Sequence, residues 1–444
     1  MPPVSEMLAR ITDFARDIFS SHLLLWVTFA LVHVWLGLLN LVGPGIPLGD
    51  VVYTYRFWMD QAFFRDYWVG IDSVWVYPIV AIVPMVLAFV VGPDLYGAGW
   101  ISLVTILNAV AFGLLTGWGQ GRDRLAVAWW WLLFLLLISP IALGRVDSVS
   151  VPIAVIGVLL LSRRPRVAAL LLVIATWIKV WPAALLAAVV VASKHRLTAI
   201  WVSVVASAAI VVTALALGSG ANVFSFITQQ TGRGLQVEAP ISTLWLWQAF
   251  AGVPGAYVYY DQGILTYQVA GMGTDVAASL MTPVLAVVAL AVVALGAVAV
   301  RRGAASLDVL APLALALVVS LIAFNKVGSP QFISWLAVPV ILGLWTSYAG
   351  STVSFRVPAA LVLVIAALTQ VLYPALYVHL LGLNTLMLLV ISVRNVLYFV
   401  LLAWAISELW MLGLRARNRV PGDGELPHNS AADWPLGAVQ RGRL

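Results

Sequence analysis

Long apolar segments recur along almost the whole chain, and this pattern constrains the fold more than any other feature. After a first span at 22–41, they occupy residues 76–91, 100–117, 125–143, 149–161, 167–192, 197–217, 276–300, 307–324, 332–345, 357–381 and 386–412. A perpendicular crossing of a bilayer takes about 20 apolar residues in a helix. We therefore expect an all-α polytopic membrane protein. Several segments are shorter than a crossing, and such broken spans are tolerated where they line an enclosed cavity.

Composition supports this class and excludes others. Hydrophobic residues make up 63% of the 444 residues and charged residues only 9%, whereas soluble domains have about 25% charged residues. The net charge of +6 lies in short basic loops and the C-terminal end, which indicates cytoplasmic retention and not nucleic-acid binding. The chain has no cysteine, which excludes disulfides and thiolate chemistry, and its five histidines lack zinc-motif spacing. No metal site is predicted.

The expected organisation has three parts. Residues 1–21 form a cytoplasmic amphipathic N-terminus, residues 22–414 form the membrane domain, and residues 415–444 form a disordered cytoplasmic tail. Because basic residues near span ends stay in the cytoplasm, a first outer loop at 43–74 and a long outer loop at 218–275 are expected on the opposite side. The first outer loop mixes charged and aromatic residues, as interfacial helices do. The charge rule conflicts with two full crossings by the segments 76–91 and 100–117, so either one of them fails to cross or the rule does not hold here.

A lysine lies in the middle of the apolar stretch 167–192. Basic runs at 163–166 and 194–196 flank this stretch, so both of its ends are expected in the cytoplasm. Pro182 interrupts it, because proline lacks a backbone donor and disfavours helix at the preceding residue. The pattern favours a hairpin of two short helices with Lys179 at its tip over a single crossing. A lysine at membrane depth costs roughly 3 kcal/mol or more, so Lys179 is a candidate site residue. The alternative is that the flexible Lys179 side chain places its ammonium group at the opposite membrane–water interface.

Polar side chains from widely separated segments are predicted on the outer face. They are Asp50, Arg145, Asp147, Lys179, Arg233, Gln236, Glu238, Lys326 and Gln331. Cations bind a phosphate and stabilise its charge, and a carboxylate accepts a proton from an attacking hydroxyl group. We therefore interpret the set as a site for an anionic, lipid-linked substrate. The alternative is a scatter of interfacial charges.

Five short motifs, in their order along the chain, resemble those of glycosyltransferase family 87. They are 49–53 (GDVVY), 77–78 (YP), 144–145 (GR), 178–182 (IKVWP) and 325–332 (NKVGSPQF). This family belongs to the polytopic GT-C superfamily and includes actinobacterial polyprenyl-phosphate-mannose-dependent α-mannosyltransferases. The resemblance runs from the first span to the last. The chain departs from it at Arg145, where the family commonly has glutamine, and at 331–335 (QFISW), where some members carry histidines. These departures do not affect the class of reaction that the resemblance implies, but the resemblance does not fix the identity of the sugar or of the acceptor.

The resemblance implies a GT-C-like fold with interfacial helices in the first outer loop. It implies transfer of a hexose, above all mannose, from a polyprenyl monophosphate donor to a hydroxyl group of a lipid or glycan acceptor, with inversion. The site would face outwards from the plasma membrane, which is the inner membrane of a bacterium. Asp50 corresponds to the catalytic base of the superfamily. Polyprenyl phosphate is itself a reasonable leaving group, so no metal site is required, although some GT-C enzymes use a divalent cation.

The other candidate residues fall into two groups. Those expected to bind the donor phosphate are Lys179, Arg145, Lys326 and Arg233. Those expected to bind the rest of the substrates are Tyr53, Arg56, Asp147, Glu238 and Gln331.

Two other classes of protein are compatible with parts of this pattern. A lipid-linked glycan flippase or another transporter also needs broken helices and intramembrane charges, but it predicts charges in both leaflets. A structural membrane protein would have no need for Lys179 or for the charged, aromatic first outer loop. Transfer of label from a polyprenyl-phosphate sugar to a membrane acceptor separates the three.

Overall fold

The computed structural model describes residues 21–119, 125–230 and 232–418, and these residues are mostly helical. The α-helices are α2 (His22–Val42), α3 (Arg56–Arg65), α4 (Ile82–Phe89), α5 (Tyr96–Thr116), α6 (Leu125–Ile138), α7 (Asp147–Leu160), α8 (Pro165–Ile178), α9 (Ala183–Ala192), α10 (Arg196–Ala216), α11 (Ser225–Thr228), α12 (Thr243–Phe250), α13 (Thr274–Arg301), α14 (Ser306–Ala323), α15 (Ala337–Ser347), α16 (Arg356–Leu372), α17 (Tyr377–Leu381) and α18 (Thr385–Arg417). The π-helix is η1 (Asp50–Tyr55), and the 3-10 helices are η2 (Ile79–Ala81), η3 (Pro93–Leu95), η4 (Gly117–Gly119), η5 (Ser139–Ala142), η6 (Gly220–Phe224), η7 (Pro240–Ser242) and η8 (Pro330–Leu336). The strands are β1 (Tyr257–Asp261) and β2 (Thr266–Ala270).

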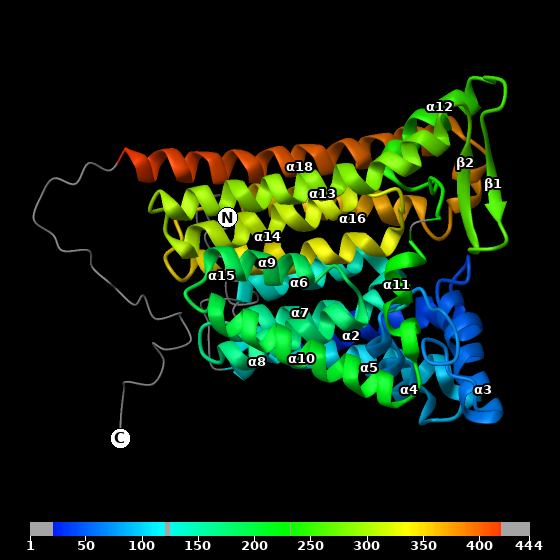
Figure 1. Ribbon diagram of the computed structural model, residues 1–444, viewed down its shortest axis with the longest axis horizontal. Helices are drawn as coiled ribbons and strands as arrows, with labels where there is room; N and C mark the ends of the chain where they lie inside the picture. The colour runs from blue at the N-terminus through cyan, green and yellow to red at the C-terminus, as the bar shows by residue number, and fades with distance from the viewer. Residues whose placement is uncertain (1–20, 120–124, 231, 419–444) are drawn as a thin grey trace, which may run out of the picture.

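Eight helices within the described ranges are long and apolar enough to cross a membrane. They are α2, α5, α6, α10, α13, α14, α15 and α18, some together with an adjoining 3-10 helix. This finding confirms the predicted all-α polytopic membrane protein. The helices lie roughly along one direction in a bundle (Figure 1). We call the end that carries α3, α12 and the two strands the site end, and the end where α18 finishes the tail end.

Burial separates the central helices of the bundle from the peripheral ones. In α14, and in α15 with its preceding 3-10 helix, 83% of the apolar window is buried, compared with 11% in α10 and 17% in α13. A helix that is apolar on all sides belongs either in a protein core or in lipid. Helix α14 is therefore the core of the bundle, and α10 and α13 present their apolar surfaces to the bilayer.

The predicted hairpin within 167–192 is confirmed. Helix α8 ends at Ile178, and Lys179 has an extended backbone (φ −151°, ψ 131°) that stops the helix. Pro182 is then the N-cap of α9, which has only 10 residues. At 1.5 Å per residue, α9 is about 15 Å long and cannot span a bilayer. The chain therefore returns to the tail end with Lys179 at the turning point.

The segment 76–91 is the one that does not cross. Its helical parts, η2 and α4, pack against α8, α3 and α5. Helix α5 then begins at the site end, where a side chain on Gly97 would contact Leu48 of the first outer loop. At the far end of α5, Phe112 packs edge-on against Trp26, near the start of α2. Helix α5 thus crosses antiparallel to α2, and the topology that the charge rule left open is decided.

Part of the long outer loop forms a β-hairpin that the sequence analysis did not predict. Strands β1 and β2 pair antiparallel, from Tyr257 opposite Ala270 to Asp261 opposite Thr266. The hairpin lies across the site end, almost perpendicular to the bundle (Figure 1). In the first outer loop, α3 also lies across the bundle direction, in the orientation expected of an interfacial helix (Figure 1).

Both expected cytoplasmic termini lie mostly outside the described residues. Residues 1–20 and 419–444 are not described. Helix α18 continues to Arg417, past the boundary expected at 414.

Candidate active site

Asp50 and Arg145 meet at the site end, although 94 residues of sequence separate the two. Asp50 is the first residue of η1, and its Oδ2 lies 3.3 Å from Nε of Arg145 in the turn before α7. An aspartate at this position could serve only to cap a helix. The N-cap of η1 is Gly49, however, so Asp50 does not have that role. The Asp50 side chain is 47% exposed, whereas that of Arg145 is only 7% exposed. A buried cation therefore holds an accessible carboxylate.

The Arg145 guanidinium is fixed on its other sides as well. Its Nη1 donates hydrogen bonds to the carbonyls of Pro47 (2.7 Å) and Gly144 (2.9 Å), and its Nη2 donates to the Tyr373 hydroxyl (2.6 Å). A Cβ at Gly144 would lie 2.6 Å from Oδ1 of Asn40, which explains glycine at this position. A planar guanidinium with several partners has a fixed direction. Arg145 can therefore orient Asp50.

Lys179 and Asp147 form a second pair beside the first. Lys179 Nζ lies 3.6 Å from Asp147 Oδ2 and 4.6 Å from the centre of the Tyr77 ring. Asp147 is completely buried, and its Oδ1 accepts a hydrogen bond of 2.7 Å from the Trp335 indole. Its Oδ2 accepts no hydrogen bond from the part of the chain that the structure describes. The ammonium at the hairpin tip thus faces a buried carboxylate and not a membrane interface.

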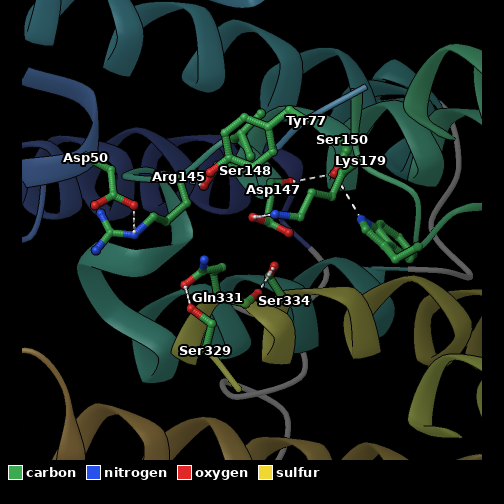
Figure 2. Close-up of polar contacts among 12 residues, drawn as sticks. Asp50, Tyr77, Arg145, Asp147, Ser148, Ser150, Lys179, Ser329, Gln331 and Ser334 are labelled. Atoms are coloured by element: carbon green, nitrogen blue, oxygen red, sulfur yellow. Dashed lines mark hydrogen bonds and ion pairs between the residues drawn. The ribbon is translucent and has the colours of Figure 1, made fainter. Parts of the chain in front are cut away.

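Tyr55 and Tyr77 connect the segments that carry these two ion pairs. The Tyr55 hydroxyl lies 3.4 Å from the backbone nitrogen of Val146 and 3.4 Å from the Tyr77 hydroxyl. Ser329 donates a hydrogen bond of 2.5 Å to Oε1 of Gln331. In the view of Figure 2, Tyr77 lies above Gln331 and Ser329, with the Asp50–Arg145 pair on the left and the Asp147–Lys179 pair on the right. The predicted site residues of α7, the hairpin tip and η8 are therefore close together.

Lys326 and Arg233 supply positive charge from two further loops. The backbone nitrogen of Gln236 donates to the carbonyl of Lys326 at 3.0 Å, and Gly328 is pressed against the backbone of Ala239. Burial, with a further contribution from Arg233, lowers the pKa of the Lys326 ammonium. Burial also lowers the pKa of Arg233. Two mutually repelling cations at one end of the bundle favour an anion between them.

Glu238 has an internal partner that the sequence analysis missed. Its Oε2 lies 2.8 Å from Nη1 of Arg394, and Nη2 of Arg394 donates to the Glu238 carbonyl at 3.1 Å. Asn395 accepts from the same guanidinium and donates to Thr243 at 2.9 Å. The signal was present, since an arginine within the apolar segment 386–412 needs a partner. The substrate-binding role predicted for Glu238 stays a prediction.

Tyr53 and Arg56 lie outside the two ion pairs of the site in the part of the chain that the structure describes. Tyr53 is 65% exposed. Arg56 forms ion pairs with Asp60 (3.8 Å) and Asp94 (3.6 Å). Their substrate-binding roles stay predictions.

The residues present do not fit a divalent cation. Among the described residues, no three histidine, cysteine, aspartate or glutamate side chains gather in one place. The two aspartates of the site, Asp50 and Asp147, each have a cation of the chain as a partner.

Comparison with known families gives a match over more than half of the chain. The family model of glycosyltransferase family 87 matches residues 75–324. This range contains the α8–α9 hairpin and both cations of the two ion pairs, Arg145 and Lys179. Comparisons with curated proteins and with solved structures give no match.

Proposed function

Because the chain belongs to glycosyltransferase family 87, we propose that it transfers a hexose, above all mannose, from a polyprenyl monophosphate donor to a hydroxyl group of a lipid or glycan acceptor. Such an enzyme needs a base for the acceptor and cations for the donor phosphate. The resemblance of its motifs to those of polyprenyl-phosphate-mannose-dependent enzymes of the GT-C type supports this choice of donor. The geometry of the site supports a division of labour among its residues.

The observation that carries the proposal is the accessibility of one carboxylate. Of the three carboxylates that the sequence places in the site, Asp147 is 0% and Glu238 3% exposed, and each is paired inside the protein. Asp50 is 47% exposed. A general base must come within hydrogen-bond distance of the proton that it accepts. Asp50 is the carboxylate of the three that an acceptor hydroxyl can reach.

In this mechanism Asp50 takes the proton of the acceptor hydroxyl through Oδ1, since Oδ2 faces Arg145. The hydroxyl oxygen forms a bond to the anomeric carbon while the bond from that carbon to the phosphate oxygen breaks. The electron pair leaves with the polyprenyl phosphate, and the configuration is inverted. Base and phosphate then lie on opposite sides of the sugar. Arg145, which contacts the base, is better placed to orient Asp50 than to bind the phosphate.

The released lipid phosphate carries up to about two negative charges, and we assign it to Lys179, Lys326 and Arg233. The 3.6 Å separation between Lys179 and Asp147 exceeds a hydrogen bond. The ammonium can therefore donate to a phosphate without losing a hydrogen bond. Each cation that approaches the leaving oxygen can lower the barrier by roughly a few kcal/mol.

Transfer by the purified full-length protein in detergent tests the proposal. The donors are radiolabelled mannose and glucose on polyprenyl phosphate, with nucleotide sugars as controls, and the acceptors are a membrane lipid extract and soluble oligosaccharides. We expect covalent transfer from polyprenyl-phosphate mannose. Absence of transfer from every polyprenyl donor would contradict the proposal. Movement of intact donor across vesicle membranes without a new glycosidic bond would indicate a transporter instead.

The proposal also requires that the site end faces outwards from the plasma membrane. The chain has no cysteine, so single cysteines can be labelled on intact cells without background. Positions 53 and 94 are exposed at the site end, and positions 164 and 302 are exposed at the tail end. We expect an impermeant thiol reagent to label the first two and to spare the others. The reverse pattern would place the site in the cytoplasm and exclude the proposed orientation.

A further inference from the structure

A row of tyrosine rings leads from the β-hairpin to Arg145. The members of this tyrosine row are Tyr260, Tyr267, Tyr377 and Tyr373. The ring centres of Tyr260 and Tyr267 are 4.9 Å apart, those of Tyr267 and Tyr377 6.2 Å, and those of Tyr377 and Tyr373 5.3 Å. Tyr373 then accepts a hydrogen bond of 2.6 Å from Arg145. The row therefore ends at the residue that holds the proposed base.

The outer part of the tyrosine row is open to solvent. Tyr260 and Tyr267 stand opposite each other on the two strands and are 45% and 37% exposed. Because side chains alternate along a strand, they share a face of the hairpin with Val258 and Val269. Val269 is buried and anchors that face to the protein. Tyr377 and Tyr373 are partly buried. Each ring of the row therefore packs against its neighbours, while the rings of Tyr260 and Tyr267 also remain exposed to solvent.

The hairpin is fixed relative to the candidate active site. Gln268, which is buried, donates to Asp261 at 2.8 Å and accepts from the Tyr259 hydroxyl at 3.3 Å. The loop before the hairpin pairs with β2, since Val237 donates to the Tyr267 carbonyl at 3.1 Å. The neighbouring residue of that loop, Gln236, donates to the carbonyl of Lys326. The tyrosine row and the proposed phosphate-binding lysine therefore belong to one hydrogen-bonded unit.

We propose that the tyrosine row binds a saccharide chain, so that the acceptor is a glycan and not a simple lipid alcohol. This inference rests on the proposed function. A tyrosine ring presents a flat apolar body and a polar tip, which complement the C–H face and the hydroxyl edge of a sugar. Several rings in a row suit several successive sugar units. The terminal unit then lies beside Tyr373 with its hydroxyl at Asp50. The competing explanation is a belt of tyrosines at the membrane interface.

Substitutions at the exposed hairpin tyrosines test this inference. Tyr260→Leu and Tyr267→Leu remove the flat ring but keep an apolar side chain, and the corresponding phenylalanine variants keep the ring. Tyr348→Leu is the matched control, because Tyr348 is also 45% exposed and follows α15 at the tail end. The acceptor KM and the donor KM are measured by radiolabel transfer to mannobiose and to mannohexaose. Equilibrium binding of mannohexaose and maltohexaose is measured separately by saturation-transfer NMR.

The wild-type protein should have a lower KM for mannohexaose than for mannobiose, by about tenfold if two rings contribute. The leucine variants should lose most of this advantage without a change in donor KM, and the phenylalanine and Tyr348→Leu variants should keep it. Equal KM values for both acceptors, or leucine variants that behave like wild type, would overturn the inference and leave the proposed function standing. Binding of a hexasaccharide that the leucine variants lose, without transfer from any donor, would support the saccharide surface and refute the proposed function. Binding of neither hexasaccharide would overturn the inference.

Discussion

Two ion pairs buried at the site end differ in how completely they are satisfied. Arg394 and Glu238 are 2.8 Å apart, and the guanidinium also bonds to the Glu238 carbonyl and to Asn395. Lys179 and Asp147 are 3.6 Å apart, and Asp147 Oδ2 accepts no hydrogen bond within the described residues. A buried charge costs free energy unless its partner and its hydrogen bonds compensate it. The first pair meets this condition, and the second meets it only in part.

This difference indicates different roles. The Arg394 pair joins α18 to the loop that carries Glu238, and the side chains of both members are almost completely buried. The Lys179 pair lies at the turning point of a hairpin, beside the accessible Asp50, and keeps donors for an anion. We therefore interpret the close pair as a clamp that supports the site end, and the loose pair as part of the site.

The largest effect is expected from breaking the clamp. Arg394→Met leaves the Glu238 carboxylate buried without a cation, which costs roughly 3–5 kcal/mol of stability. Thermal and denaturant unfolding of the purified protein in detergent would measure the loss. The double variant Arg394→Met with Glu238→Gln should recover much of it, because no buried charge is then left alone. An unchanged unfolding midpoint in the single variant would show that the pair is no clamp.

The loose pair should respond in binding more than in stability. Lys179→Met keeps the apolar stem but removes the charge, so affinity for polyprenyl-phosphate mannose should fall about tenfold or more. Stability should fall less than in Arg394→Met, since the 3.6 Å pair of Lys179 and Asp147 has no hydrogen bond to lose, whereas Arg394 loses its bonds to Glu238 and Asn395. Lys179→Arg should restore binding only in part, because a planar fork does not replace a point charge. Normal donor binding by the methionine variant would assign Lys179 to the structure alone.

A smaller effect is expected from pH. Burial and the nearby Arg233 lower the pKa of Lys326 below its ordinary value, so its charge is present below that pKa and lost as pH rises through it. Donor affinity should therefore fall a few-fold on the alkaline side, earlier than for an ordinary lysine. Lys326→Arg should remove this alkaline decline, because arginine stays charged. An identical pH profile in both proteins would exclude Lys326 from phosphate binding.

Features that depend on local sequence could be predicted. The lengths of the apolar segments predicted the helices, and the basic residues that flank 167–192, together with Pro182, predicted the hairpin. The free-energy cost of a charge inside the membrane identified Lys179 as a candidate site residue. The same argument, applied to Arg394, predicts a buried partner for that arginine. The aromatic and β-branched residues of 257–260 (YVYY) and the alternation of polar and apolar residues in 266–270 (TYQVA) also favour strands. The sequence analysis nevertheless predicts a loop there, because the region lies between two long apolar segments.

Features that depend on contacts between remote segments could not be predicted. Nothing in the sequence around Asp147 shows that Trp335 and Lys179 meet its two oxygens. Segment 76–91 does not cross the membrane because it packs against α3, α5 and α8. The distribution of charged residues does not reveal this packing. Arg145 and Asp50 are also far apart in the sequence, so the sequence alone assigns Arg145 to the donor phosphate and does not show its contact with Asp50. That contact changes the role that we propose for it.

One measurement tests the central claim that Asp50 performs the chemistry while other residues hold the donor. Donor binding and turnover are measured on the same preparations of wild type, Asp50→Asn and the control Asp94→Asn, whose aspartate is 96% exposed at the site end. Asp50→Asn should bind polyprenyl-phosphate mannose with about wild-type affinity and lose turnover by about a hundredfold or more, the usual scale for a lost general base. Asp94→Asn should keep both. Near-normal turnover in Asp50→Asn would contradict the account.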